Sequence, residues 1–317
     1  MQRFLDAIRA RESRYLTTTG AYVELGLGYD SNVNSGLANS NVNLPALGPV
    51  VVAQNNQKLS SGVLSLGAGA YISHPVAPGV ALFGSAAGDR RFHDSDLKKP
   101  FEQGNYNVGG GVSLLREQNL FRLGLSYSAL TVGSPTYRTS IGGSAEWQHQ
   151  LDERQSFSVS GQLAQLAHPD PNGARDADFY GVSVGYRRLF AHAWQPTLNV
   201  GLSAGRQQSR TGRPELVPDT YGATAGISFT PAAKWGVALN YQFQQSDYRA
   251  VDPFLQLLGY NDARKDQYHS LGAVVSYAYN RNISLRAEGT IVRNDSNIDL
   301  FTFPRESLLL KMRYEFK

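Results

Sequence analysis

The chain has 317 residues, no cysteine, a formal net charge of +4 and only 18% charged residues. The missing cysteines exclude disulfides, thiolate catalysis and cysteine metal sites. No lysine- or arginine-rich run points to a nucleic-acid partner. With 41% hydrophobic residues, 32 glycines and 17 tyrosines, the composition is typical of a membrane barrel whose strands alternate between lipid and water.

Residues 2–16 form the one good helical segment, because Phe4, Leu5, Ile8 and Leu16 recur at roughly helical spacing. We therefore expect a short N-terminal helix within residues 1–18 and a barrel over residues 19–317. The charged start has no apolar stretch before a small-residue cleavage site, so no signal peptide is visible. An exported protein would then be present here in a mature or truncated form.

From residue 21 onward the apolar period is two, as in strands with one face toward lipid. In the last run, residues 308–316, a shift of one residue would place Lys311 and Arg313 in lipid. Near the midplane that placement costs about 2–4 kcal/mol for each residue. The register of this run is therefore well specified.

Fourteen such runs can be counted, an even number as single-chain bacterial barrels usually have. Residues 59–88 lack Asp, Glu, Lys and Arg, but Pro75 and Pro78 divide them, which favours two strands over a membrane helix. The predicted fold is an all-β, transmembrane, up-and-down antiparallel barrel of about 14 strands. The runs are centred near residues 25, 67, 84, 110, 125, 142, 161, 184, 202, 225, 240, 274, 287 and 311.

The connections alternate in length. Those after even-numbered runs are short, and most of those after odd-numbered runs are longer, including 34–60 and 249–264. Outer-membrane barrels have short periplasmic turns and longer outer loops, so both termini are expected in the periplasm. A β-sandwich would have no reason to sort its loops in this way. Aromatic residues near strand ends are expected to form interfacial girdles: Tyr22 or Tyr29, Tyr137, Trp147, Phe157, Tyr180, Trp235, Tyr277, Tyr279, Tyr314 and Phe316.

The second face of the strands supplies charged residues that we expect to point into the lumen. Most are expected to pair across the wall and brace it, and others to line a water-filled path. Their mixed signs predict no strong preference for anions or cations. These lumen candidates are Glu24, Arg122, Arg138, Glu146, Arg187, Arg286, Glu288, Lys311, Arg313 and Glu315.

A catalytic or metal site is not indicated. The six histidines are scattered and show no metal or triad spacing, so we expect no enzyme activity and no cofactor. The segment from Asp30 to Asn34 starts like a calcium loop, D-x-N-x-N. Ser35 stands where glycine belongs and Asn41 where an acid belongs, which favours a solvated loop or a strand-end cap.

Two long loops carry apolar residues that usually mark contact surfaces or folded-in plugs. The first loop, 34–60, is expected either to fold into the lumen and gate it or to pack on its neighbours. The loop contact candidates are Leu44, Val51, Phe254, Leu257 and Tyr260.

The run GAYVELGLGYDSNVN after a helix, followed by fourteen strands and an aromatic last strand, resembles the C-terminal barrel of the surface lipoprotein assembly modifiers. The resemblance covers about residues 20–317 and is most specific at 28–34. It implies that residues 2–16 are the last helix of, or a linker to, a periplasmic repeat domain. The last strand resembles the signal read by the barrel assembly machinery, with Tyr314 and Phe316 forming both that signal and one side of a lateral seam.

The resemblance implies a translocon-type barrel of the Gram-negative outer membrane that helps to deliver lipoproteins or secreted proteins to the cell surface. Its expected partners are membrane lipids, the barrel assembly machinery and a protein cargo, and we expect a monomer. The alternative is a channel for passive diffusion or polysaccharide export. Polysaccharide export predicts lumen aromatics for sugar stacking, and the inward faces offer few, Tyr22 and Tyr71 among them. A loop-driven receptor or adhesin would need ordered, outward-facing loops.

Overall fold

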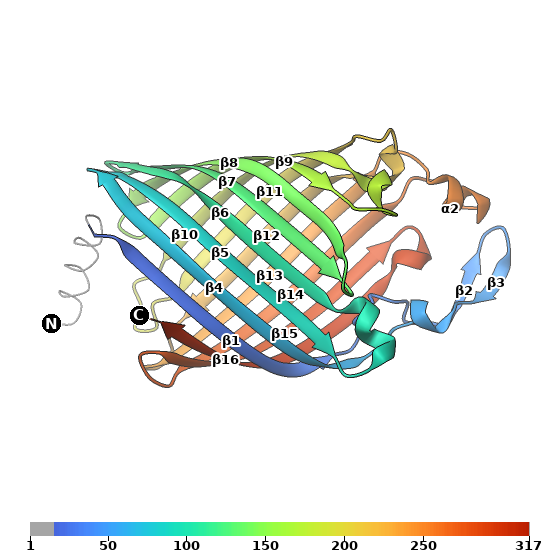
Figure 1. Ribbon diagram of the computed structural model, residues 1–317, viewed down its shortest axis with the longest axis horizontal. Coiled ribbons are helices and arrows are strands. Elements are labelled where there is room, and N and C mark those ends of the chain that lie inside the picture. Colours follow the sequence, from blue (N-terminus) through green and yellow to red (C-terminus); the bar gives the residue numbers. More distant parts are fainter. Residues whose placement is uncertain (1–15, 317) are drawn as a thin grey trace.

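The computed structural model describes residues 16–316, and within them the chain forms a closed antiparallel barrel of fourteen strands. Each strand pairs with the strands next to it along the chain, and the first and last strands close the barrel (Figure 1). This confirms the predicted up-and-down barrel and its strand count. The barrel strands are β1 (Thr18–Asp30), β4 (Ser61–Ala77), β5 (Val80–His93), β6 (Gln103–Arg116), β7 (Asn119–Val132), β8 (Thr136–Asp152), β9 (Gln155–Ala167), β10 (Ala177–Leu189), β11 (Thr197–Ser209), β12 (Pro218–Phe229), β13 (Trp235–Tyr248), β14 (Lys265–Ala278), β15 (Ile283–Ser296) and β16 (Phe303–Phe316).

The two ends of the barrel differ. One end, which we call the turn end, holds the start of β1, the end of β16 and the short connections (Figure 1). The other, the loop end, holds the longer loops. These loops contain a two-stranded hairpin, a short α-helix and several short 3₁₀ helices. These elements are β2 (Asn41–Leu44), β3 (Gly48–Val51), η1 (Gln54–Asn56), η2 (Asp96–Phe101), η3 (Gly173–Arg175), η4 (Pro214–Leu216), α2 (Pro253–Leu257) and η5 (Asp299–Phe301).

The outward faces of the strands carry an apolar belt. In β1, Val23, Leu25 and Leu27 are exposed, whereas Gly26 between them is buried against the neighbouring strands. The same alternation continues through β16, as the period of two predicts. Strands of 12 to 17 residues are long enough to cross a bilayer with tilt, which takes about 9–11 residues.

Aromatic residues mark both borders of this belt. At the turn end, outward rings meet in neighbouring pairs, including Trp147 with Phe157 and Trp235 with Tyr277, whose centroids are 6.3 and 4.9 Å apart. Nearer the loop end the exposed outward rings are tyrosines: Tyr29, Tyr106, Tyr127, Tyr180, Tyr221 and Tyr241. Amphipathic rings at two levels are what a membrane's two interfaces favour. Tyr22, one of two girdle alternatives in the sequence, faces inward.

Several rings lie flat over glycines of an adjacent strand. A Cβ on Gly69 would sit 2.6 Å from the ring of Tyr22, and one on Gly20 would sit 2.5 Å from the ring of Tyr71. The aromatic side chain thus fills the space that the glycine leaves open on the next strand. These glycines are required by the packing of the wall, not by an unusual backbone conformation.

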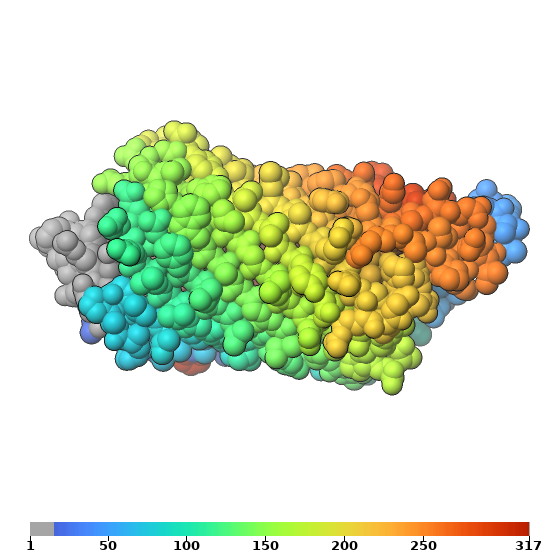
Figure 2. Space-filling model, turned by 90° about the horizontal axis from the view of Figure 1, so that it is seen from above, coloured from blue at the N-terminus to red at the C-terminus, as the bar shows by residue number. Residues whose placement is uncertain are grey.

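The loop end has a small core of its own. Leu37, Val42 and Leu44 of the first loop are buried together, and Leu258 and Tyr260 of the sixth loop pack against them. The hairpin and α2 accordingly lie at the same end of the molecule, where Figure 2 shows their blue and orange atoms side by side. The first loop therefore packs on its neighbours, one of the two outcomes expected for it.

The predicted N-terminal helix lies outside the described residues, except for Leu16 at its end. Within the described part of the chain, no helix is both long enough and apolar enough to cross a membrane.

Candidate functional site

A partly buried ionic network joins the strands on both sides of the barrel's closure. Glu24 of β1 accepts a hydrogen bond from Arg313 Nε of β16 at 3.0 Å and another from Arg286 of β15. Lys311 Nζ lies 3.4 Å from Glu24 Oε1 and 2.7 Å from Glu288 Oε2. The Glu24 side chain is only 10% exposed. These inward residues, all predicted for the lumen, therefore brace β1, β16 and β15 from inside. We call the wall formed by these three strands the seam wall.

The local sequence explains why these charges meet. Glu24 and Arg313 are direct partners in the register of β1 and β16, and Arg286 and Lys311 are partners in that of β15 and β16. Residues directly opposite each other in adjacent strands have side chains within contact distance. The Arg313 guanidinium also lies 4.0 Å from the centroid of the Tyr22 ring, a cation–π geometry.

A second buried ion pair closes the same seam at the loop end. Asp30, the last residue of β1, is 3% exposed in its side chain, and Arg305 of β16 donates from Nε to Oδ1 (3.1 Å) and from Nη2 to Oδ2 (2.6 Å). Bidentate pairs of this kind are strong and directional. The register between these ion pairs is unbroken, from Ala21 opposite Phe316 to Asp30 opposite Ser307.

The D-x-N-x-N segment at Asp30 forms the strand-end cap that the sequence favoured, although it is buried rather than solvated. The backbone N–H of Asn32 donates to Asp30 Oδ1, and the Asn32 amide donates to the carbonyls of Gly36 and Pro304. The oxygens that would bind a calcium ion are thus engaged with protein partners. The motif fastens the start of the first loop to β16.

The lumen next to the seam wall is hollow. A cavity of about 560 Å³, here the charged-wall cavity, is lined by the seam network and by inward residues of β4 to β8. This size lies within the range of small-molecule sites, about 300–1,000 Å³. Its polar lining comprises Tyr22, Glu24, Ser65, Asp89, Arg91, Asn105, Asn107, Ser128, Arg138, Arg286, Lys311 and Arg313.

Two further cavities lie along the interior. The loop-end cavity, about 230 Å³, has Arg91, Tyr268 and Arg305 in its lining, together with Ser35 from the first loop. Arg91 also lines the charged-wall cavity, so the two are neighbours. The third, the amide cavity of about 320 Å³, is lined mainly by uncharged hydrogen-bonding side chains: Asn199, Thr224, Asn240, Gln242, Ser270 and Thr290.

The other lumen candidates are less engaged. Arg122 and Glu146 are register partners on β7 and β8 with 3.5 Å between Nη1 and Oε2, and both are well exposed, at 49% and 35%. Arg187 lies on the inward face of β10 toward the turn end, opposite Asn199 and Ser156. Glu315 lies opposite Tyr22 near the end of β16. Arg138 lines the charged-wall cavity.

The loop contact candidates divide into two groups. Leu44 is buried in the loop-end core and Tyr260 packs against it. Val51, Phe254 and Leu257 are instead exposed on the hairpin and on α2. Tyr314 and Phe316 point outward at the turn end, with ring centroids 5.0 Å apart, beside the seam.

The sequence analysis underestimated the inward aromatics. Beside Tyr22 and Tyr71, Tyr268 and Phe303 line the loop-end cavity. Phe179 lies over Gly181 and Gly205, whose added Cβ atoms would sit 2.8 and 2.9 Å from its ring. The alternating pattern of β10 and β16 already placed Phe179 and Phe303 on the inward face, so the signal was present in the strand parity. Because the Phe179 ring packs against the wall over these two glycines, it fills space there and does not offer a free face for stacking on a sugar.

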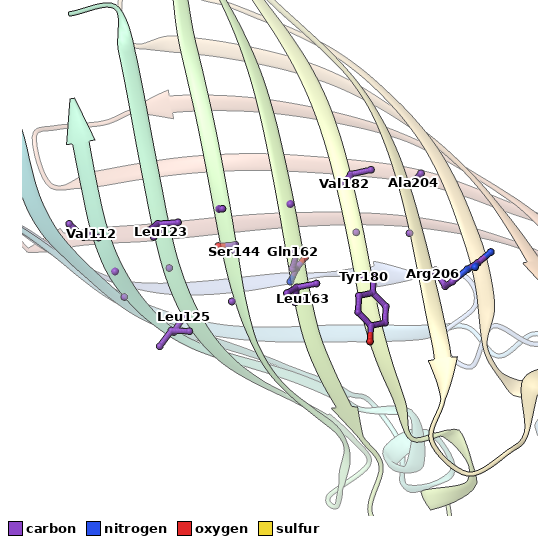
Figure 3. A pocket seen from close by; sticks show the side chains of 18 of the residues that line it. Val112, Leu123, Leu125, Ser144, Gln162, Leu163, Tyr180, Val182, Ala204 and Arg206 are labelled. Atoms are coloured by element: carbon purple, nitrogen blue, oxygen red, sulfur yellow. The ribbon is translucent and has the colours of Figure 1, made fainter. Parts of the chain in front are cut away.

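A concavity on the opposite side of the wall is larger than any of these lumen cavities. It has a volume of about 1,060 Å³ and crosses β5 to β12. Its large side chains, including Leu125, Leu163 and Tyr180, stand on the near face of the strands in Figure 3, and that of Gln162 lies behind its strand. Leu125, Leu163 and Tyr180 are exposed on the outward face. The groove therefore faces the apolar surroundings of the barrel and not the lumen.

Asp94 and His168 are among the loop residues with shifted pKa values. A hydrogen bond from the Lys98 ammonium, with one from the Gly62 N–H, lowers the pKa of Asp94 to about 2. Burial lowers the pKa of His168, and the positive charge of Arg138 lowers it further. Arg138 thus exerts a positive potential at the loop-end border of the lumen.

No protein-family model matches the chain, and no curated protein matches it. Similar solved structures include the outer membrane channel DcaP of Acinetobacter baumannii, with 12% identity, a TM-score of 0.48, and coverage of 95% of this chain and 97% of that one. An anion-selective porin from Comamonas acidovorans has 12% identity, a TM-score of 0.47 and coverages of 95% and 99%. A FadL homologue of Pseudomonas aeruginosa has 10% identity, a TM-score of 0.47 and coverages of 95% and 89%. Similarity at this level carries no argument about what this chain does.

Proposed function

We propose that the chain is a channel of a Gram-negative outer membrane through whose lumen small polar solutes diffuse. The observation that carries this proposal is the set of polar cavities inside the barrel, about 560, 320 and 230 Å³ in volume. Hydroxyl, amide and charged side chains line them, and such groups replace the hydration of a passing solute. The apolar belt and the two aromatic girdles support the membrane location.

The long loops then face outward and both termini lie in the periplasm, because outer-membrane barrels keep their short turns on that side. The partners of this channel are the surrounding lipids and, during assembly, the machinery that reads the aromatic last strand. The braced seam supports a path through the lumen. Lateral release would have to break the β1–β16 ladder, the partly buried network at Glu24 and the Asp30–Arg305 pair.

A second candidate is the translocon-type barrel that delivers lipoproteins or secreted proteins to the cell surface. It is supported by the segment from Gly28 to Asn34 and by the exposed apolar residues at the loop end, Val51, Phe254 and Leu257. Exposed apolar clusters rimmed by polar residues often mark protein contacts. In this reading those loop residues hold the cargo as it leaves the barrel.

Cysteine blocking tests the channel, since the chain has no cysteine of its own. Asn107 faces the charged-wall cavity, and its neighbour Val108 is exposed on the outer face. In liposomes, a bulky maleimide on an Asn107→Cys variant should reduce the uptake of a small neutral sugar severalfold. The same reagent on Val108→Cys should leave uptake unchanged. Equal uptake in labelled and unlabelled Asn107→Cys would refute passage through the lumen.

The translocon candidate has a separate test in cells. A triple variant, Val51→Ser, Phe254→Ser and Leu257→Ser, should fold normally because these side chains are exposed. It should lower the surface labelling of a co-expressed lipoprotein while sugar uptake stays normal. Unchanged labelling in the triple variant and in a strain lacking the protein would remove this candidate.

A further inference from the structure

The charged-wall cavity has more positive than negative charge. Five basic side chains line it, and two carboxylates, Glu24 and Asp89, line it with them. Glu288 adds a third carboxylate by pairing with Arg286 and Lys311 from within the seam network. The cavity thus keeps an excess of two positive charges, and the mixed signs of the sequence candidates did not show that this excess gathers in one cavity.

The excess is shared by the two sides of the cavity, one charge at the seam and one where Arg91 and Arg138 face Asp89, but the cations without an ion-pair partner lie away from the seam. Glu24 and Glu288 form ion pairs with Arg286, Lys311 and Arg313. Besides the Arg286–Glu24 pair, the four nitrogen–oxygen distances are 2.7 to 3.4 Å. On the other side of the cavity, Arg91 and Arg138 make no ion pair with any residue of the described part of the chain. Guanidinium groups with free donors bind carboxylates and phosphates through two parallel hydrogen bonds.

The position of Arg91 links these two arginines to the entrance. Arg91 lines both the loop-end cavity and the charged-wall cavity, so a solute that enters from the loop end meets it between the two. Arg305, which lines the loop-end cavity, is neutralised by Asp30. The first cation without a carboxylate partner along this route is therefore Arg91, followed by Arg138.

The neutral part of the lining fits a hydroxylated ligand. Asn105, Asn107 and Ser128 lie on the inward faces of β6 and β7 and line the same cavity. Amides and hydroxyls can both donate to and accept from alcohol groups. Arg91 and Arg138 would bind the charged end of such a molecule, and these neutral groups its hydroxyls.

We propose that the charged-wall cavity is a binding site for small hydroxylated organic anions, held through a carboxylate or phosphate by Arg91 and Arg138. The inference rests on the proposed channel function and names its substrate class. It also makes the channel anion-selective, although the sequence alone predicted no strong preference.

The test uses the folded full chain in neutral detergent at low ionic strength, because salt screens exposed charges beyond about 10 Å at 0.1 M. Calorimetric titration with citrate and with inorganic phosphate gives the affinity for each anion, and the better probe identifies the charged group preferred. The variant Arg91→Gln/Arg138→Gln should bind the better probe at least tenfold more weakly. The variant Arg91→Lys/Arg138→Lys keeps both charges and should retain part of the affinity.

A matched control removes one arginine from the outer surface. Arg293 of β15 is exposed, pairs with Asp295 and has outward register neighbours, so Arg293→Gln should leave the affinity unchanged. A gel shift on heating verifies that each variant is folded. Affinity equal in the double glutamine variant and the starting protein would overturn the proposal, as would the absence of binding to the starting protein.

Two measurements in bilayers separate this proposal from the channel function. In a KCl gradient, the reversal potential of the starting protein should show that chloride permeates more readily than potassium. The double glutamine variant should lose that preference. Neutral sugar uptake should remain in both. Uptake without anion preference would refute the anion site and leave the channel intact, whereas no uptake in any variant would refute the channel itself.

Discussion

The seam wall and the wall across the lumen are built in opposite ways. On β15, β16 and β1, the inward side chains form a partly buried ionic network around Glu24 and a buried ion pair at Asp30. Strands β9 to β12 form the wall that we call the neutral wall. Their inward faces carry mainly serine, threonine, glutamine, asparagine and glycine. Within these described strands, Arg187 is the one charged residue on the inward faces. Both sides thus have the backbone ladder, and only the seam wall adds a network of ion pairs to it.

The difference follows from chain connectivity. Neighbouring strands of the neutral wall are joined by turns and loops, so their pairing is local along the chain. Strands β1 and β16 are paired although they lie at opposite ends of the sequence. The interactions between them must therefore offset a large loss of chain entropy on closure. Side-chain ion pairs at this one junction add register specificity where no turn supplies it.

The largest expected effect comes from removing the centre of the seam network. Glu24→Gln leaves Arg286, Lys311 and Arg313 with less negative charge in a partly buried site that borders a polar cavity. Losing one partner of a fully buried pair costs about 3–5 kcal/mol. Urea unfolding of the refolded barrel should show a loss near the lower end of that range.

The matched control for Glu24 is Glu146→Gln, which breaks an exposed pair with Arg122 in the same lumen. Exposed pairs contribute about 0–1 kcal/mol, so its unfolding should change by no more than that. Equal losses for the two substitutions would contradict the distinction between the seam wall and the rest of the lumen.

A smaller effect is expected from glycines. A Cβ on Gly28 of β1 would sit 2.1 Å from the Leu308 carbonyl oxygen of β16, so Gly28→Ala must shift the seam backbone. Overpacking of this kind costs about 1–3 kcal/mol.

On the neutral wall, a Cβ on Gly161 would meet its nearest atom, the Gly181 carbonyl oxygen, at 3.9 Å. Gly161→Ala should therefore change the unfolding free energy by less than about 0.5 kcal/mol; a larger loss there than at Gly28 would reverse the comparison.

The smallest effect concerns the outer groove, where stability should not change. Gly161→Cys places a thiol in the groove, and Ser160→Cys places one on the inward face of the same strand. In liposomes, a membrane-impermeant maleimide added on both sides should label Ser160→Cys and not Gly161→Cys. Labelling at position 161 would mean that the groove is open to water.

The strands could be predicted from the sequence because lipid and lumen impose opposite demands on alternating residues. A single residue such as Lys311 sufficed to fix the phase of β16. The loop-end hairpin and α2 were not predicted, since their stability comes from a core shared by loops far apart in the chain, such as Leu44 and Tyr260.

The candidate site was predicted only as a set of inward charges. Parity gave the faces of Glu24 and Arg313, but their pairing depends on the register across the closure, which joins residues 289 positions apart. For the same reason the sequence did not separate the paired arginines from Arg91 and Arg138. Arg91 was absent from the predicted set because the run around residue 84 is rich in alanine and glycine and its end was uncertain.

The central claim is that solutes pass through the lumen while the seam stays closed, and a disulfide lock tests it directly. Leu25 and Met312 are register partners on β1 and β16, and both face outward. A Leu25→Cys/Met312→Cys variant, oxidised in liposomes, is compared with Leu123→Cys/Ala145→Cys across β7 and β8. Sugar uptake should be the same in the oxidised and reduced forms of both variants. Uptake that disappears on oxidation of the seam pair alone would contradict the account, because it would show that transport requires β1 and β16 to separate.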